Sequence, residues 1–327
     1  MINIGYKLCS EEHSPADLVK FAQRAEQVGF AFAMISDHYH PWTHSQGQSP
    51  FVWSVLGAIA LTTKRLRVGT GVTCPTIRIH PAIIAQASAT VAAMMPGRFV
   101  LGLGAGENLN EHITGEKWPP ADVRLKMLEE AIRIIRLLWS GDQRSYYGDY
   151  YTVENAELFT LPKKTPLIAV AGGGEKSAIL AGQVADGFIG TAPKEKLLKA
   201  FSDSGGKGKP CFGEVSVCWA KNESEGRRTA LECWPNVAIT GELTQELRTP
   251  AHFEQATEML TEDKVAEEVV CGCDPEKHIA AIKKYAEAGY DNVWVHQIGP
   301  DQEGFFDFYE TEILPKLASA KVVKARN

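Results

Sequence analysis

Short apolar runs alternate along the chain with amphipathic segments. Runs such as Ile2–Leu8 and Phe30–Ile35 have the length and content of buried strands. Between the runs, segments such as Val52–Thr62 and Arg124–Trp139 carry apolar residues at helical spacing. About eight strand–helix units follow one another, which favours parallel strands joined by helical crossovers. Such a series in 327 residues predicts a TIM (β/α)8 barrel that spans 1–327 as one domain.

Two segments interrupt this alternation. Gly141–Val153 contains turn residues between short polar runs, and it predicts a small hairpin inserted after a long helix. Residues 236–261 lack the strand–helix pattern, and we interpret them as a helical excursion over the barrel mouth. Both segments are therefore expected to be additions to the barrel.

Composition and charge narrow the range of partners. The hydrophobic fraction of 44% and charged fraction of 23% are ordinary for a globular protein. The net charge of −6, without a basic run, argues against nucleic acid as a partner. The apolar runs are too short to span a bilayer, and the opening residues lead straight into a strand pattern. Seven cysteines, an odd number, favour a reducing, cytoplasmic location over a disulfide framework. The expected partner is a small-molecule substrate.

Polar residues gather where the predicted strands end. Ser36–His44 follows an apolar run and supplies a carboxylate, three imidazoles and an indole. In parallel barrels the carboxyl ends of all strands meet on one face, where the chemistry takes place. Further polar or glycine-rich segments fall on the same predicted face: Lys7–Glu11, Gly71–Pro75, Gly104–Asn110, Ala171–Ser177, Thr191–Lys194 and His296–Gln297. The sequence therefore predicts a site for redox chemistry against a planar cofactor.

Two of these segments leave alternatives open. The Gly172–Gly174 turn before a helix suits a phosphate, but it lacks the dinucleotide fingerprint, and its glycines can simply permit a tight turn. His38, His40 and His44 have no acidic or cysteine partner at diagnostic spacing, so we expect no metal site. For His44 a structural role is the better interpretation, whereas His38 beside a strand end favours a functional one.

Several motifs in a fixed order carry a family resemblance. They include Ser36-Asp37-His38 with Pro41-Trp42, Gly104-Ala105-Gly106-Glu107 with Asn110-Glu111, and Ala185-Asp186-Gly187-Phe188. Along nearly its whole length the chain resembles the deazaflavin-dependent dehydrogenases of the bacterial luciferase-like superfamily, especially the F420-dependent glucose-6-phosphate and alcohol dehydrogenases. The resemblance implies a luciferase-like barrel with inserted segments, coenzyme F420 as cofactor, and a homodimer.

The resemblance also implies roles for individual residues. His38 corresponds to the residue that exchanges a proton with the substrate hydroxyl, and Glu107 to the acid/base near the deazaflavin ring. Glu11 lies close by, and Trp42 packs over the reacting centre. Val72 would follow a non-proline cis peptide, and Cys74 replaces the usual threonine with a weaker hydrogen-bond donor. The cofactor-binding positions are Asp37, Val72, Cys74, Asn110, Gly173, Gly174, Lys176, Ser177 and Thr191.

The residues at the phosphate-binding positions of the family narrow the choice of substrate. Of three cations that grip the phosphate in the sugar-phosphate members, Lys194 matches the first, while Gln255 and Glu268 replace the others. We therefore expect a neutral alcohol or an unphosphorylated sugar. An F420-dependent sugar-6-phosphate dehydrogenase is the alternative, and an FMN-dependent luciferase-like monooxygenase is a further one. A cofactor-binding protein without turnover is disfavoured, because both acid/base candidates are present.

Overall fold

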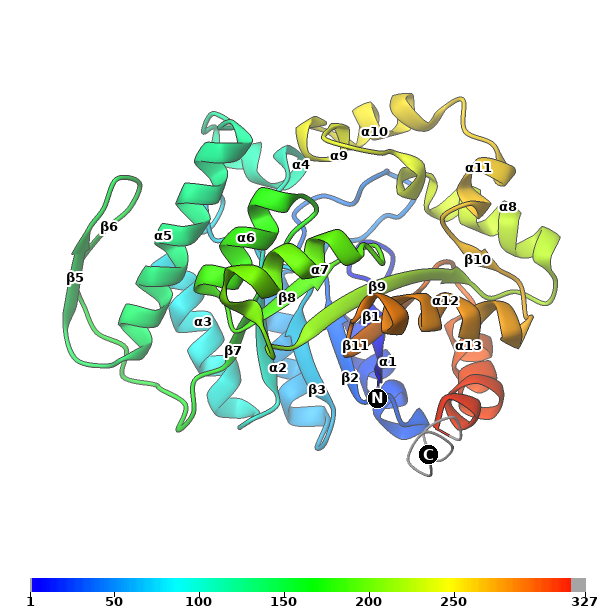
Figure 1. The fold of residues 1–327 in the computed structure, drawn as a ribbon, viewed down its shortest axis with the longest axis horizontal. Coiled ribbons are helices and arrows are strands. Elements are labelled where there is room, and N and C mark those ends of the chain that lie inside the picture. Colours follow the sequence, from blue (N-terminus) through cyan, green and yellow to red (C-terminus); the bar gives the residue numbers. More distant parts are fainter. Residues whose placement is uncertain (1, 319–327) are drawn as a thin grey trace.

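The computed structural model describes residues 2–318, and eight parallel strands form its centre (Figure 1). β1 pairs with both β2 and β11, and β9 pairs with both β8 and β11, so the sheet closes on itself. The predicted TIM barrel is confirmed. Its strands are β1 (Asn3–Leu8), β2 (Phe32–Ile35), β3 (Arg67–Thr70), β4 (Phe99–Leu103), β7 (Leu167–Ala171), β8 (Gly187–Gly190), β9 (Cys211–Cys218) and β11 (Asn292–Gln297).

Helices surround the barrel and carry the added segments. The longer helices are α1 (Pro15–Val28), α2 (Val52–Thr62), α3 (Pro81–Met94), α5 (Ala121–Trp139), α6 (Glu175–Val184), α7 (Glu195–Phe201), α8 (Glu223–Cys233), α10 (Pro250–Thr257), α12 (Pro275–Ala288) and α13 (Gln302–Phe308). Shorter ones are α4 (Asn108–Glu111), η1 (His112–Thr114), η2 (Ser202–Gly206), η3 (Pro235–Ala238), α9 (Leu243–Glu246), α11 (Glu262–Ala266) and η4 (Tyr309–Ile313). None of the helices within residues 2–318 has the length and apolar content needed to cross a membrane.

Strand alternation separates two apolar layers. Tyr6 and Leu8 of β1 face outward into the large core between barrel and helices. Phe32, Phe212 and Trp294 belong instead to a separate cluster that fills the inside of the barrel. Since successive strand residues point to opposite faces, Lys7 lies on the inside, between two outward-facing neighbours. The interior is therefore apolar at its base and polar toward the carboxyl ends of the strands.

The added segments are largely as expected. The predicted hairpin contains β5 (Arg144–Tyr147) and β6 (Thr152–Ala156), which project from one side of the molecule (Figure 1). Residues 236–261 are mostly helical, and Asn108 after β4 donates a hydrogen bond to the Glu246 carbonyl, 3.1 Å away. This contact places the excursion on the side of the strand carboxyl ends, where the candidate site lies.

The sequence pattern placed one strand too late and missed two elements. The run Glu214–Trp219 predicts a strand, whereas β9 begins at Cys211, which already pairs with Phe188 of β8. The helix α8 and the short strand β10 (Val270–Cys271) were not predicted at all. α8 is rich in charged residues, and only Gly226 and Ala230 are buried in it, so it lacks a continuous apolar stripe.

Candidate active site

His38 meets two carboxylates at the barrel mouth. It follows β2, and its Nε2 lies 3.5 Å from Glu11 Oε1 and 3.6 Å from Glu107 Oε2. Its Nδ1 lies 3.1 Å from the carbonyl oxygen of His40. A carbonyl only accepts, so we assign the proton of the neutral ring to Nδ1, which leaves a lone pair on Nε2. His38 is therefore oriented to take up a proton between two acidic side chains.

Glu11 is the buried member of this trio. Its side chain is 1% exposed, and it accepts hydrogen bonds from Ser36 Oγ at 2.5 Å and from the Cys9 thiol at 3.2 Å. Burial alone would raise the pKa of Glu11, but His38, Lys7 and the Ser36 hydrogen bond lower it to about 2. Glu11 is thus an anion at neutral pH, with its Oε1 3.5 Å from Nε2 of His38.

Glu107 is more accessible, with a side chain that is 32% exposed. Asn110 holds it, because Asn110 Nδ2 donates to Glu107 Oε2 at 3.1 Å. The Oδ1 atom of Asn110 accepts the backbone N–H groups of Tyr39 and His40 at 2.9 and 3.1 Å. One buried amide therefore links the loop after β2 to Glu107 and sets their relative position.

Trp42 forms a wall of the site. Its ring lies 4.9 Å from the His38 ring and 5.1 Å from Phe253 of α10. The backbone N–H of Trp42 donates to Gln46, whose amide in turn donates to Asn236 at 3.1 Å. The excursion 236–261 thus holds the indole beside His38.

Asp37 lies in a buried ion pair that the sequence did not predict. Its carboxylate accepts from Arg78 Nη2 at 2.9 Å and from Thr73 Oγ1 at 2.7 Å. Arg78 also faces Glu111, with 3.6 Å between Nε and Oε1. Because both oxygens of Asp37 are engaged, it acts first by anchoring the β2 and β3 loops to each other. Sequence reasoning missed Arg78, which lies between β3 and α3.

Two positions expected to hold a planar cofactor, Val72 and Cys74, lie together after β3. The peptide bond between Gly71 and Val72 is cis, as the resemblance implied. Val72 packs partly buried against the apolar cluster inside the barrel. Cys74 is buried, with its thiol 3.0 Å from Thr76 Oγ1. A Cβ on Gly106, whose φ is +83°, would come within 2.5 Å of that sulfur, so only glycine allows this close approach.

The other expected cofactor positions surround the start of α6. Gly173 and Gly174 are exposed, and added Cβ atoms would meet nothing within 4 Å. Ser177 Oγ accepts from the Gly174 N–H at 3.2 Å, and Lys176 is exposed beside it. A helix start with accessible amides and a lysine suits an anionic group. Thr191, after β8, is exposed at the same end of the barrel.

The three expected substrate residues are exposed. Lys194 precedes α7, Gln255 lies on α10, and Glu268 follows α11. Glu268 lies near enough to help raise the pKa of Tyr285, after the larger effects of burial and Glu214. The hydroxyl of Tyr285 donates to the carbonyl of Thr191 at 3.1 Å. Within residues 2–318, no hydrogen bond or ion pair joins Lys194, Gln255 and Glu268 to one another.

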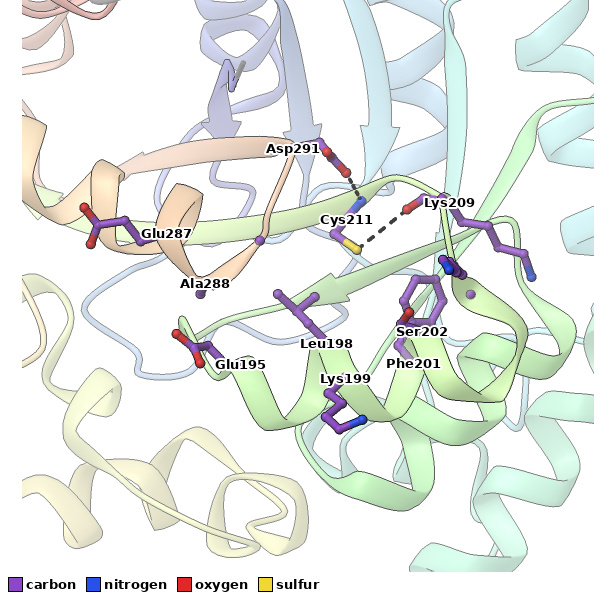
Figure 2. Close-up of a pocket in the computed structure, with 14 residues that line it drawn as sticks. Glu195, Leu198, Lys199, Phe201, Ser202, Lys209, Cys211, Glu287, Ala288 and Asp291 are labelled. Atoms are coloured by element: carbon purple, nitrogen blue, oxygen red, sulfur yellow. Dashed lines mark hydrogen bonds between the residues drawn. The ribbon is translucent and has the colours of Figure 1, made fainter. Parts of the chain in front are cut away.

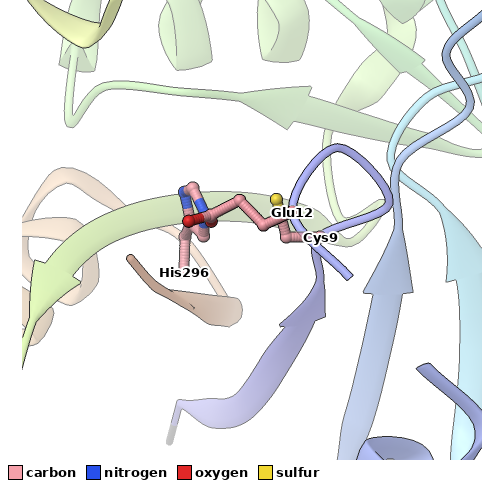
Figure 3. A group of neighbouring side chains, drawn as sticks. All are labelled: Cys9, Glu12 and His296. Atoms are coloured by element: carbon pink, nitrogen blue, oxygen red, sulfur yellow. The ribbon is translucent and has the colours of Figure 1, made fainter. Parts of the chain in front are cut away.

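Cys9, Glu12 and His296 form a second buried cluster beside Glu11 (Figure 3). Their ligand atoms lie within 4.8 Å of one another. Burial raises the pKa of Glu12 to about 7 and that of the Cys9 thiol well above its usual value, and it lowers that of His296. With the Lys7 ammonium also close by, the cluster suits hydrogen bonding between neutral groups better than a divalent cation.

The raised pKa of Glu12 predicts how stability depends on pH. The folded state holds the proton up to about pH 7, whereas the unfolded chain releases it near 4.5, so stability falls as pH rises through this window. A glutamine can still accept from the Gly299 N–H and donate to His296 without titrating. We expect Glu12→Gln to reduce the loss of unfolding free energy between pH 5 and 8 by about 1–3 kcal/mol.

Thermal or denaturant unfolding at pH 5 and pH 8 measures this effect. The exposed Glu287→Gln is the matched control and should leave the pH profile unchanged. Equal profiles for wild type and Glu12→Gln would show that Glu12 titrates as in the unfolded chain.

A separate hollow lies on the outside of the barrel (Figure 2). It is lined by α7 and by Cys211 and Asp291, at the amino ends of β9 and β11. Asp291 accepts the Cys211 N–H at 2.9 Å, and Lys209 caps the end of α6 by donating to the Gly182 and Ala185 carbonyls. These polar groups are engaged in hydrogen bonds that hold the fold, and His38 is not among the residues that line the hollow.

The sequence of the chain is similar to known proteins over nearly its whole length. The model of the luciferase-like monooxygenase family matches residues 3–292. The chain belongs to this family. An F420-dependent glucose-6-phosphate dehydrogenase of Microbacterium testaceum is 37% identical, with 97% of each chain covered. One of Amycolatopsis mediterranei is 35% identical, with 97% of this chain and 99% of the relative covered.

A solved structure of the family is also similar over almost the whole length. An F420-dependent secondary alcohol dehydrogenase, in complex with an F420–acetone adduct, superimposes with a TM-score of 0.88 at 30% identity. The match covers 95% of this chain and 98% of that one. A monooxygenase from Streptomyces bottropensis has a TM-score of 0.74 at 20% identity, and it supports the fold alone.

Proposed function

We propose that this protein is an F420-dependent dehydrogenase that transfers a hydride between the CH–OH group of an alcohol or sugar and the deazaflavin. His38 and Glu107 act as its acid/base pair. The observation that carries the proposal is that His38 lies between Glu11 and Glu107 at the barrel mouth, in the loop after β2, while the Gly71–Val72 cis peptide follows the neighbouring strand β3. The relatives named as F420-dependent dehydrogenases support the choice of cofactor.

Residues of two regions would hold the cofactor. Val72, Cys74 and Asn110 would border the ring, and Gly173 to Ser177 would bind the acidic, phosphate-bearing tail. The fit rests on the open helix start of α6, which has accessible amides, and on Val72 at the top of the apolar barrel interior. Bound F420 would supply a ring carbon that accepts or releases the hydride.

Side chains of the protein then transfer the proton of the substrate hydroxyl. Nε2 of His38 takes the proton of the substrate hydroxyl as the hydride leaves the adjacent carbon. Anionic Glu11 stabilises the resulting imidazolium, and the His40 carbonyl keeps the ring oriented. Glu107, held by Asn110, provides an acid/base group at the ring side, while Trp42 excludes water.

Cofactor choice tests the proposal directly. We expect F420 to bind much more tightly than FMN, because its longer anionic tail can use the start of α6 and Lys176. Quenching of tryptophan fluorescence during titration with each cofactor measures both affinities. Equal or tighter FMN binding, with oxygen consumption after reduction, would favour the monooxygenase alternative instead.

The proposal includes a homodimer. Phe51, Leu61 and Ile83 are all more than half exposed, on or next to the neighbouring helices α2 and α3. Large apolar side chains gathered on adjacent helices are typical of a protein interface. Sedimentation velocity should give the mass of a dimer, and Leu61→Lys combined with Ile83→Lys should shift it toward the monomer. A wild-type monomer at micromolar concentration would contradict this assembly.

A further inference from the structure

Three charged or polar side chains inside the barrel have no role in the proton transfer described above. They are Lys7 of β1, Glu214 of β9 and His296 of β11. Trp294, two residues before His296, fills the barrel interior, so His296 points to the same side one step closer to the mouth. Glu214 lies opposite Trp294 in the β9–β11 register. The three side chains therefore form a polar layer directly above the apolar base.

The layer contains unused hydrogen-bonding capacity. Lys7 Nζ donates to Glu214 Oε1 at 3.0 Å, its one hydrogen bond among residues 2–318, although an ammonium has three donors. The other oxygen of Glu214 accepts from Trp294 Nε1 at 2.7 Å. His296 is fully buried, and its Nδ1 has no hydrogen-bond partner within the described part of the chain. It lies 3.8 Å from Glu214 Oε1, too far for a direct bond.

Buried polar groups are nearly always paired, so the unpaired Nδ1 of His296 points to a ligand that can form a hydrogen bond with it. A hydroxyl group suits it, because one hydroxyl can accept from Lys7 while donating to Glu214 or to His296 Nδ1. A ligand can reach the layer from the barrel mouth, since the side chains of Lys7 and Glu214 are 9% and 14% exposed.

The layer also faces the substrate side of the site. β9, β11 and β1 are consecutive around the barrel, while most of the expected cofactor positions follow β3, β4 and β7 on the other side. Lys7 lies close enough to Glu11 to lower its pKa, which ties the layer to the proton-transfer centre. The indole of Trp234 covers it, 5.3 Å from Lys7 Nζ and 4.5 Å from the His296 ring.

Building on the proposed function, we propose that Lys7, Glu214 and His296 form a subsite for a second hydroxyl group of the substrate, which is an uncharged sugar or polyol. Carboxylate, ammonium and imidazole together pair with hydroxyls of either polarity, and Trp234 offers a flat apolar face to a carbon skeleton. Lys7 is neutralised by Glu214, and Glu11 adds negative charge, so the subsite holds no spare cation for an anionic substrate.

Steady-state assays with F420 test the subsite. Wild type should have a kcat/KM at least tenfold higher for a polyol or for D-glucose than for 2-propanol. Lys7→Met combined with Glu214→Gln removes both charges together and avoids leaving one unpaired. This variant should lower the ratio of polyol to 2-propanol kcat/KM by about 10- to 100-fold, mainly through KM. His296→Phe, which keeps the contact with Trp234, should lower the same ratio.

The control replaces an exposed ion pair of the same chemistry. Lys199→Met combined with Asp203→Asn on α7 and η2 should leave the ratio unchanged. A wild type that prefers 2-propanol to every polyol and sugar, or variants that lose both activities equally, would overturn the subsite while leaving the dehydrogenase assignment intact. Failure to bind F420, or to oxidise any hydroxyl compound with it, would instead overturn the proposed function and the subsite with it.

Discussion

Replacing His38 by alanine is expected to lower turnover with the best hydroxyl substrate by about two to four orders of magnitude, the usual contribution of a general acid/base. The imidazole lies within 3.6 Å of both Glu11 and Glu107, so its removal takes away the base that stands between the two carboxylates. F420 affinity should change little, because His38 approaches the reacting centre from the β2 side.

Turnover followed by deazaflavin absorbance, and affinity followed by fluorescence, separate these two effects. The matched control is His44→Ala, since His44 is exposed and pairs with Glu254 at 3.0 Å on the outside of the excursion. That variant should keep near wild-type turnover. A His38→Ala protein with near wild-type turnover would make His38 structural and would move the role to Glu11 or His40.

The fold could be predicted from the sequence because barrel strands are short apolar runs separated by amphipathic helices. The helices α1 and α12 also carry clear signals at their ends, a side-chain cap with proline at the start and a glycine with positive φ at the end. The charged helix α8 carried no such apolar pattern, and β10 is only two residues long. Local patterns fail where tertiary contacts alone decide the structure.

The sequence predicted those residues of the candidate site that directly follow a strand. His38 and Glu107 follow β2 and β4, so convergence of the carboxyl ends was enough to bring them together. The pairing of Lys7 with Glu214 joins residues 207 positions apart, and that of Arg78 with Asp37 depends on the path of a loop. No local pattern encodes such partners. A lysine in an apolar run, such as Lys7, indicates only that the strand ends nearby.

The second large effect, on activity with glucose 6-phosphate, is expected from placing positive charges at Gln255 and Glu268. Wild type should use glucose 6-phosphate poorly, since the phosphate carries nearly two negative charges and Glu268 places a carboxylate where the resemblance to the sugar-phosphate members implies a cation. Gln255→Lys combined with Glu268→Arg removes this repulsion and adds two donors. We expect kcat/KM for glucose 6-phosphate to rise by about 10- to 1,000-fold, from roughly 1.5–3 kcal/mol per charged hydrogen bond discounted for exposure.

The gain should come from a lower KM, because a phosphate held away from the reacting carbon binds equally in the ground and transition states. Gln143→Lys combined with Glu154→Arg makes the same change in net charge on the exposed hairpin, and it should have little effect. Activity with unphosphorylated glucose should also change little in the Gln255 and Glu268 variant. A wild type already efficient with glucose 6-phosphate would mean that Lys194, with another cation, suffices to bind the phosphate, and that the excursion holds its residues differently from the sugar-phosphate relatives.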